Sequence, residues 1–379
     1  MKIVHLCLSA FYIDNYSYQE NMLPKYHVKM GYDVTVIASL QTFNKQGKPD
    51  FLEKGSTYED ANGYKVIRLD YIKPLKIGRL LRKYQELRKY LEEEKPDIVF
   101  SHNVSYADAA IVADYLKAHP NVKCFADNHA DYINSAHGYI SRNILHGILW
   151  KHYAKVLEPY VTRFYGVTPM RCRFLKEMYN LPEKKIDFLP MGVDDESIPA
   201  DRQRVKADIR KELGIHENAQ VIVTGGKIDK LKNTHILLSA LKKIGNDRLH
   251  LIICGTLTPE MQYLDEQIND NPNIHYLGWC DAKRVMDCMV ASDIACFPGT
   301  HSTLWEQSVG VGLPAIFKRW NEMEHVNIND NCILIEGENE QALIDAIQKV
   351  LANYSIFKEK AIIASLSFLY SNIAKKAIK

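Results

Sequence analysis

The 379-residue chain lacks several features that would mark a protein class at once. No apolar run reaches the roughly 18 residues that span a bilayer. Residues 1–11 become polar too early for a signal peptide, so we expect a buried strand there instead. None of the eight cysteines forms a C-x-x-C pair, which excludes zinc-ribbon spacing, and reduced thiols fit the cytoplasm. A formal net charge of only +2 excludes a chain that binds nucleic acid through its overall charge.

What the sequence does contain is an alternation of short β-branched runs with longer amphipathic segments, which is typical of parallel α/β sheets. The pattern predicts strands over residues 2–8, 33–38, 65–69, 97–101, 123–126, 163–167 and 185–189, and again over 220–224, 249–254, 274–277, 294–297, 315–317 and 332–335. Helices are expected over residues 18–30, 78–94, 106–118, 233–243, 282–289, 303–309 and 340–351.

A break in this rhythm falls at residues 189–199, where two prolines and a glycine stand among acidic residues. Such a composition predicts a linker. We therefore expect two Rossmann-like, doubly wound domains, residues 1–194 and 195–362. Ligands bind at the carboxyl ends of strands in open α/β sheets, so we also expect the chemistry in a cleft between the two domains.

Two loops of the second domain carry groups suited to an anion. Residues 224–233 join a predicted strand to a helix, and Gly226 lets the backbone approach a ligand there. Lys227 and Lys232 lie in the same turn, and lysine is a common partner of phosphate, although the P-loop pattern is not met. An ordinary glycine turn is the alternative interpretation.

The second of these loops, residues 297–306, also follows a predicted strand and opens a helix. Ser302 or Thr303 is a candidate N-cap, and the unpaired N–H groups of a helix start attract anions. Glu306 lies one turn further on, where its carboxylate could accept bonds from ribose hydroxyls. The alternative is a capping box, in which Glu306 only closes its own helix.

At these residues the chain resembles glycosyltransferase family 4, a retaining group with the GT-B fold. The family's G-[RK]-x4-K motif is matched at residues 226–232, and residues 189–194 (Leu-Pro-Met-Gly-Val-Asp) resemble its P-N-G-V-D hinge. Residues 276–278 (Tyr-Leu-Gly) resemble its F-L-G phrase, and 306–316 resemble E-A-x-A-x-G-x-P-x-[IV]. The C-terminal residues, about 363–379, resemble the family's last helix, which returns to the first domain.

The resemblance implies a role for each matched residue. Lys227 and Lys232 would bind the diphosphate of a nucleotide-sugar donor, and Glu306 would hold the ribose. The other donor contacts it implies are Gly226, Gly278, Trp279, His301, Ser302, Thr303 and Leu304. Trp279 has a second interpretation as a plain packing residue. No metal and no other cofactor is expected, because lysines and a helix start can oppose the leaving charge.

The chain departs from the family at the first glutamate of the E-x7-E pair, because position 298 is proline. His301 stands in the space where that carboxylate normally acts. It could bond to the sugar or to a phosphate oxygen, or it could only cap the helix. A non-catalytic or epimerase-like GT-B protein is therefore a second hypothesis.

In the first domain, the resemblance places a catalytic histidine near the donor sugar, and His129 matches it, with the neighbouring acid displaced to Asp131. The loop after the first strand is polar and aromatic. Tyr16, Tyr18 and Gln19 suit a sugar acceptor, since rings stack on pyranose faces and amides bond to hydroxyls, and Asp131 is the fourth predicted acceptor contact. A tyrosine-rich surface loop is the alternative.

Basic and apolar residues are interleaved from Lys73 to Lys89, as in segments that lie on anionic membranes, although a solvated helix face is also possible. We expect a cytoplasmic protein that contacts the inner face of the membrane. The resemblance implies transfer of a sugar to a glycan or lipid-linked glycan in cell-surface polysaccharide synthesis. A dinucleotide-dependent oxidoreductase is a more distant alternative, because G-x-G-x-x-G is missing after the first strand.

Overall fold

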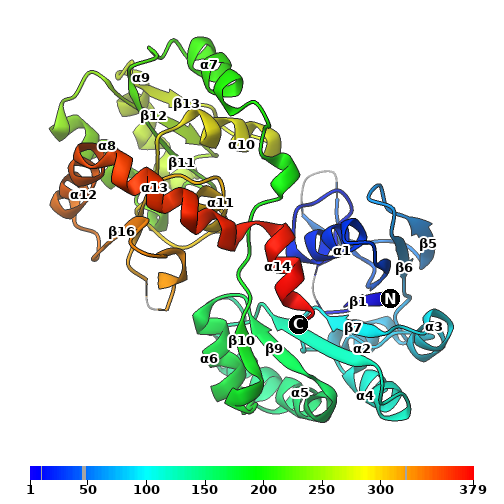
Figure 1. Ribbon diagram of the computed structural model, residues 1–379. Coiled ribbons are helices and arrows are strands. Elements are labelled where there is room, and N and C mark those ends of the chain that lie inside the picture. The colour runs from blue at the N-terminus through cyan, green and yellow to red at the C-terminus, as the bar shows by residue number, and fades with distance from the viewer. Residues whose placement is uncertain (10, 45–47, 321) are drawn as a thin grey trace. The chain divides into compact units, whose positions relative to one another are not determined.

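The computed structural model describes residues 1–9, 11–44, 48–320 and 322–379. The chain forms two compact units (Figure 1). The first contains Met1–Pro190 together with the terminal segment Ile373–Lys379, and the second contains Met191–Asn372. The change of unit falls four residues before the boundary that the sequence suggested. Each unit is an α/β domain with its own sheet and core, as the alternating pattern predicted.

The first unit is built on an eight-stranded sheet in the order β10-β9-β8-β7-β1-β2-β6-β5, in which only β5 is antiparallel to its neighbour. Its strands are β1 (Lys2–Cys7), β2 (Asp33–Ala38), β5 (Ser56–Glu59), β6 (Lys65–Arg68), β7 (Ile98–Ser101), β8 (Lys123–Asn128), β9 (Arg163–Gly166) and β10 (Ile186–Phe188). The central strands are buried almost throughout, as expected of parallel strands covered on both faces.

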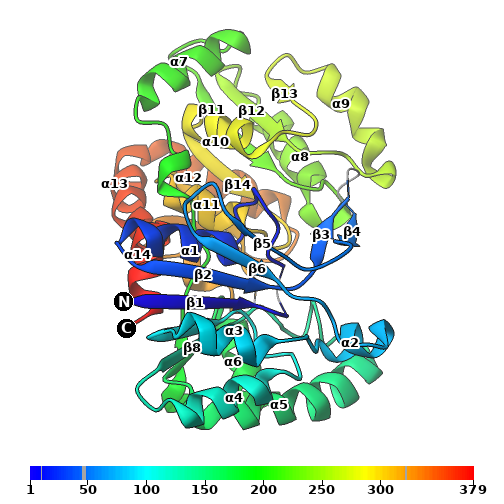
Figure 2. The same cartoon turned by 90° about the vertical axis from the view of Figure 1, so that its right-hand side faces the viewer.

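The helices of this unit are α1 (Gln19–Lys29), α2 (Leu75–Leu81), α3 (Leu87–Glu94), α4 (Ala109–Ala118), a π-helical segment (Ile140–Trp150) that continues into α5 (Lys151–Leu157), and α6 (Pro169–Glu177). A small antiparallel pair, β3 (Gln41–Phe43) and β4 (Pro49–Phe51), follows β2. Helices α4 and α5 pack against each other below the sheet in the view of Figure 2. The sequence pattern did not predict the long helix over residues 140–157.

The single helix predicted over residues 78–94 is wrong. Helix α2 ends at Leu81, Arg82 and Glu86 take left-handed backbone conformations (φ 52° and 59°), and α3 starts at Leu87. The break is made by Tyr84, which is buried, pairs with Tyr71 in an isolated β-bridge and contacts the Tyr71 ring at a tilt. Burial of one aromatic ring against the core therefore overrides the local helical pattern.

The second unit contains a six-stranded parallel sheet in the order β13-β12-β11-β14-β15-β16. Its strands are β11 (Gln220–Gly225), β12 (Leu249–Cys254), β13 (Ile274–Tyr276), β14 (Ile294–Phe297), β15 (Ala315–Lys318) and β16 (Cys332–Ile335). All six lie where the sequence placed them, within one residue at each end.

The helices of this unit are α7 (Arg202–Glu212), α8 (Thr234–Ile244), α9 (Asp265–Asn269), α10 (Ala282–Ala291), α11 (Leu304–Gly310), α12 (Glu340–Ala352) and α13 (Tyr354–Ser365). Helix α7 packs on α10, and α8 packs on α12. The last helix, α14 (Tyr370–Ala377), begins in this unit and ends in the first one.

Both sheets reverse their direction of growth at one point. In the first unit the chain adds strands on one side of β1 and then on the other side, from β7 onward. In the second unit the same reversal falls between β11 and β14. The crevice at the carboxyl ends of two such strands is where ligands of open α/β sheets bind. The loops after β1 and β7, and after β11 and β14, are therefore the places to look for chemistry.

Candidate functional site

The loop after β11 carries the two predicted phosphate-binding lysines. Gly226 has φ +98°, a backbone conformation that glycine adopts without strain. Lys227 follows it, and its side chain is exposed. A short 3-10 turn, Lys230–Lys232, then leads into α8. Asp229 starts that turn by accepting a hydrogen bond from the Leu231 N–H (3.0 Å), so the loop has a defined shape that presents both lysines.

The loops after β11 and β14 are in direct backbone contact. The Thr300 N–H donates to the Leu231 carbonyl oxygen (3.0 Å). A β-carbon at Gly299 would lie 2.2 Å from that same carbonyl oxygen, so only glycine fits there. Asn233 adds a side-chain bond to the Pro298 carbonyl (3.0 Å). The proline that replaces the family's first glutamate is therefore part of a tight junction between the two loops.

Lys232 reinforces this junction. Its Nζ donates to the carbonyl oxygens of Thr300 (2.7 Å) and His301 (3.4 Å). Burial lowers the pKa of Lys232, while Asp229 opposes that shift. The ammonium thus sits partly desolvated between the loops, where a further negative group would be held more strongly than in water.

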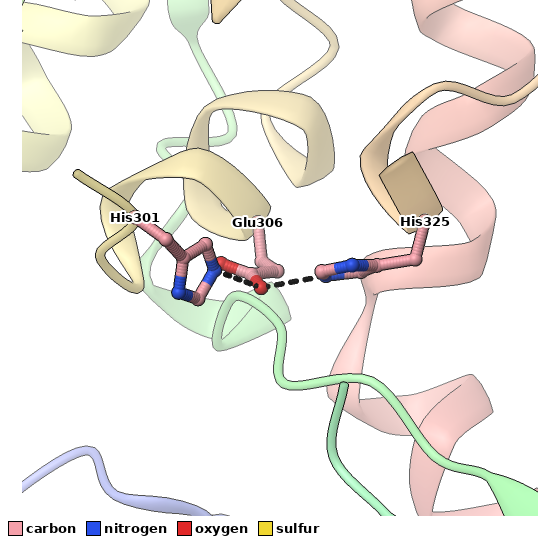
Figure 3. Close-up of side chains that lie close together, drawn as sticks. All are labelled: His301, Glu306 and His325. Carbon is pink, nitrogen blue, oxygen red and sulfur yellow. Dashed lines mark hydrogen bonds and ion pairs between the residues drawn. The ribbon is translucent and has the colours of Figure 1, made fainter. Parts of the chain in front are cut away.

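Glu306 on α11 is completely buried and is held by two histidines (Figure 3). Its Oε1 atom accepts from His301 Nε2 at 2.7 Å and from His325 Nε2 at 2.8 Å. His325 comes from the 3-10 turn Glu324–Val326. The capping-box interpretation is wrong, because no side chain caps α11, and Glu306 bonds to these two imidazoles rather than to its own helix.

The charge and bonding of Glu306 leave one oxygen for another partner. Although burial pushes it upward, the pKa of this carboxyl is held well below its usual range by His301 and His325. The Oε2 atom is buried and has no hydrogen-bond partner. The Ser302 Oγ and Trp305 Nε1 atoms are in the same state. Buried polar atoms without partners cost about 1–3 kcal/mol each, so this cluster is suited to a polar ligand.

His301, Glu306 and His325 are also the one group of side chains, among the residues described, whose ligand atoms converge as a metal site requires. Two imidazoles and a carboxylate would suit zinc. Both Nε2 atoms, however, lie at hydrogen-bonding distance from the same carboxylate oxygen, and the bonds account for the geometry without an ion.

Trp279 follows Gly278 in the loop after β13. The Gly278 carbonyl accepts from the Gly255 N–H (2.7 Å), which fixes the loop against the end of β12. The Trp279 side chain is 79% exposed, so its interpretation as a packing residue is wrong. An exposed indole is a surface on which a flat ring can stack.

The first unit presents His129 directly after β8. Its Nε2 lies 3.5 Å from Asp127 Oδ1 and 3.9 Å from Glu20 Oε1, and no hydrogen bond satisfies that nitrogen. Burial opposes protonation, but Asp127 and Glu20 raise the pKa of His129, and Arg171 acts against them. The site therefore favours an imidazolium, a group that can stabilise negative charge.

The predicted acceptor residues of this unit differ in availability. Tyr16 and Tyr18 are about 40% exposed, and their rings lie 5.3 Å apart. Gln19 is buried and donates to Asp127 Oδ2 (3.4 Å), while its Oε1 has no partner. Asp131 accepts from the Ile133 and Asn134 N–H groups and pairs with Arg171 Nε (3.0 Å). Its carboxylate thus shapes its own loop.

Sequence reasoning missed several residues that the structure brings to these sites. His325 lies 19 positions beyond Glu306 in an irregular segment, and nothing in its surroundings in the sequence distinguishes it. His5, His27, His102 and Asp127 were also missed. His5 lies inside the predicted strand 2–8, and Asp127 directly follows the predicted strand 123–126. Polar residues within or at the end of buried apolar runs were a usable signal.

Two family models together match most of the chain. Residues 23–197 match the model described as Glycosyltransferase Family 4, and residues 205–365 match the model described as Glycosyl transferases group 1. A D-inositol 3-phosphate glycosyltransferase of Corynebacterium urealyticum is 21% identical over 194 residues, which are 47% of this chain and 46% of that protein. The chain thus spans about half the length of the curated relatives it matches.

Solved structures resemble the whole chain. Anabaena HepE in complex with UDP-glucose has a TM-score of 0.64 at 15% identity, covering 100% of this chain and 98% of the other. UDP-GlcNAc 2-epimerase from Neisseria meningitidis, bound to UDP-GlcNAc, has a TM-score of 0.60 at 15% identity, covering 99% and 98%. At this identity the likeness establishes the fold.

The fold is therefore GT-B, with two Rossmann-like α/β domains, as the sequence predicted. The chain belongs to the glycosyltransferases, with a family 4 domain followed by a group 1 domain. This membership argues against the dinucleotide-dependent oxidoreductase.

Proposed function

We propose that the protein transfers a sugar from a nucleoside-diphosphate sugar to an acceptor hydroxyl, with retention of configuration and without a metal or other cofactor. The observation that carries the proposal is the arrangement at the switch point of the second unit. Lys227 is exposed there, Lys232 is partly desolvated between two loops, and Glu306 keeps one buried oxygen without a partner. A diphosphate and a ribose would satisfy these groups.

Each group has a role in this proposal. Lys227 and Lys232 oppose the charge that develops on the leaving diphosphate, joined by backbone N–H groups of Thr303 and Leu304. The Glu306 Oε2 atom accepts from a ribose hydroxyl while its two histidines occupy Oε1. Gly226 lets the backbone approach the donor closely, and Gly278 and Trp279 contact the nucleotide base. The Ser302 Oγ atom is a further donor contact.

The first unit supplies the remaining groups. His129, held toward its charged form by Asp127 and Glu20, stabilises charge near the sugar that leaves the donor. Tyr16 and Tyr18 offer exposed rings to a glycan acceptor. Gln19 and Asp131 complete the proposed acceptor set, Gln19 through its unpartnered Oε1.

The acceptor in this proposal is a glycan or lipid-linked glycan of cell-surface polysaccharide synthesis, reached from the cytoplasmic face of the membrane. No helix in the described part of the chain has the length and apolarity to cross a bilayer. Helix α2 exposes Leu75, Ile77 and Leu80 beside Lys76, which supports peripheral contact with an anionic surface. Arg82 of the same stretch turns inward and donates to the Ser105 carbonyl.

The π-helical segment Ile140–Trp150 adds to this support. Ile140, Ile144 and Ile148 recur every four residues on one face and are all exposed, with Tyr139 exposed beside them. A row of exposed apolar side chains of this kind would gain from contact with lipid.

The test is a two-stage assay on the full chain. A thermal-shift screen over nucleoside diphosphates and their sugars identifies the donor, and a ligand at 100 times its Kd stabilises by about 2.7 kcal/mol. Incubation of that donor with glycan acceptors then reveals transfer by mass spectrometry. Binding without release of nucleoside diphosphate, with or without acceptor, would leave a non-catalytic binding protein as the better description.

An epimerase is the second candidate, because the fold also resembles UDP-GlcNAc 2-epimerase. An epimerase changes the sugar of the donor without any acceptor. The two candidates separate when the identified donor is incubated alone and the sugar nucleotide is examined by NMR. Inversion at one sugar carbon identifies the epimerase, whereas an unchanged donor that reacts only with acceptor identifies the transferase.

A further inference from the structure

Three buried histidines of the first unit form an unbroken line of hydrogen bonds that ends on a carboxylate. His27 Nε2 contacts the Ala374 carbonyl oxygen (3.0 Å), and His27 Nδ1 contacts His5 Nε2 (2.9 Å). His5 Nδ1 contacts His102 Nε2 (3.0 Å), and His102 Nδ1 contacts Asp127 Oδ2 (2.9 Å). The side chains of all four titratable members are fully buried. The line joins α14, α1, β1 and the ends of β7 and β8.

The two ends of this line fix how many protons it holds. A backbone carbonyl only accepts, so His27 must donate from Nε2, and its Nδ1 must then accept from His5. The same argument passes along the line: His5 donates from Nε2, so its Nδ1 accepts from His102 Nε2. Three neutral imidazoles supply three N–H groups, but the line contains four hydrogen bonds. One extra proton is therefore required between His102 and Asp127.

The surroundings of Asp127 place that proton on the imidazole rather than on the carboxyl. Asp127 Oδ1 accepts from the Asn103 N–H (2.9 Å), and Oδ2 accepts from Gln19 Nε2 (3.4 Å). A carboxylate that accepts several N–H bonds is stabilised in its charged form. Although burial pushes it upward, the pKa of Asp127 lies well below its usual range because of His102 and His129.

The other two imidazoles are held neutral. Burial, and the neighbouring His27 and His102, lower the pKa of His5. Burial lowers the pKa of His27 to about 4, the bond to Ala374 opposing it and His102 adding to it. Rings stack along the line, with His5 5.1 Å from His27 and 5.2 Å from His102 between centroids. Of the three histidines, only His102 can therefore carry the extra proton.

We propose that His27, His5 and His102 form a hydrogen-bonded line in which His102 is held as an imidazolium against Asp127. This line positions His129, which lies on the other side of the same carboxylate. The proton count stands on the hydrogen bonds alone, whereas the use of His129 in sugar transfer rests on the proposed function. The line cancels the buried charge of Asp127 on one side while Asp127 Oδ1 faces His129 Nε2 at 3.5 Å. Glu20 and Arg171 are the other charged groups that face His129.

The first experiment needs no variant. Long-range proton–nitrogen NMR spectra of the full chain labelled with ¹⁵N-histidine, recorded at pH 9, distinguish protonated from bare ring nitrogens. Ordinary histidines, with a pKa near 6.5, carry one ring proton there. We expect four N–H groups on His5, His27 and His102 together, and both nitrogens of His102 protonated. Three N–H groups would overturn the proposal, because the extra proton would then be missing or on the carboxyl.

Asp127→Asn is the matching variant. An asparagine amide can donate to His102 Nδ1 while its oxygen still accepts from the Asn103 N–H, and Gln19 can turn its unpartnered Oε1 toward the new amide. The line then needs only three imidazole protons. We expect the fourth N–H signal to disappear and the titration midpoint of His129 to fall, because Asp127 raises its pKa.

His275→Asn serves as the control. His275 forms an ordinary two-histidine pair with His250 in the second unit (3.1 Å). That change should leave both the four N–H signals and the His129 midpoint unaltered. An unchanged His129 midpoint in Asp127→Asn would show that the line is only structural. All of these readouts are independent of sugar transfer, so their failure is distinct from failure of the proposed function.

Discussion

The ammonium of Lys232 lies 2.7 Å from the Thr300 carbonyl oxygen, so a lysine of one loop fastens the backbone of the next. Lys232 is thus part of the fold of the site as well as a candidate ligand of the diphosphate. Replacing it by alanine would leave two carbonyls without their donor and would lower stability and binding together. Lys227, whose side chain is exposed, separates the two effects.

Lys227→Ala should weaken binding of the nucleoside diphosphate about tenfold to a hundredfold, as expected for loss of a charge-assisted hydrogen bond of about 1.5–3 kcal/mol. The melting temperature without ligand should not change. Calorimetric titration measures the first quantity and a thermal scan the second. Lys230→Ala, an exposed lysine of the same loop, is the matched control and should bind like the parent chain. If both variants lost the same affinity for the nucleoside diphosphate, Lys227 would act only through general electrostatic attraction and not through a direct contact.

Glu306→Gln tests the ribose contact. The parent chain should prefer the nucleoside diphosphate over its 2′-deoxy or 3′-deoxy analogue by about tenfold, since one hydrogen bond to a charged oxygen is lost. In the variant the preference should shrink, because the single amide oxygen accepts from the two histidines and the group left for the ribose is an NH2, which donates and cannot accept. Competition binding gives both ratios. A parent chain that does not distinguish ribose from both deoxyriboses would contradict the role given to Glu306 Oε2.

The first unit should lose stability as the pH falls from about 6.5 to about 4. The pKa of His27 is lowered to about 4 in the folded chain, mainly by burial, against about 6.5 unfolded. In this window the unfolded chain binds the extra proton, so unfolding is favoured as acid is added, by about 3 kcal/mol over the window. Hydrogen exchange of β1 peptides at several pH values measures this loss of stability.

His27→Gln is the control for that dependence. A glutamine can still donate to the Ala374 carbonyl and accept from His5, but it does not titrate. Its protection should therefore fall less steeply with acid than that of the parent. Identical slopes would assign the acid sensitivity to other groups, such as His146, whose pKa burial also lowers to about 4.

Removal of divalent metals should have no effect on donor binding. In the proposed arrangement His301 and His325 donate hydrogen bonds to Glu306 and need no ion between them. Dialysis against EDTA, followed by the thermal-shift assay and by metal analysis, tests this. Stoichiometric zinc in the purified protein, with a thermal shift that disappears when the zinc is removed, would instead identify His301, Glu306 and His325 as a metal site.

Membrane contact through α2 should depend on charge and on exposed apolar area together. Lys76→Glu and Leu80→Asp should each reduce flotation with vesicles of anionic lipid, and salt should weaken binding of the parent chain. Lys349→Glu, an exposed lysine of α12 in the other unit, should float like the parent. Flotation that no α2 variant changes would remove this surface from the proposal.

The strands and the positions of several site residues could be predicted, because local sequence patterns indicate them. Apart from the exposed edge strand β5, the strands of both sheets follow from runs of buried β-branched residues, and β12, β14 and β16 were predicted to the residue. The positions of Lys227 and Lys232 after β11, and of Glu306 in the first turn of α11, followed from the same pattern. The break between α2 and α3 did not, because Tyr84 is drawn from a helical pattern by a ring 13 residues earlier in the chain.

The sequence by itself determined the α/β class, the two-domain organisation and the positions of the loops after β11 and β14, because strand and turn preferences act over a few neighbouring residues. Only the tertiary structure decided which side chains meet. His325 reaches Glu306 from 19 positions away, and His27, His5, His102 and Asp127 come together from four separate elements. Sheet order and loop packing set those distances, and a one-dimensional pattern does not contain them.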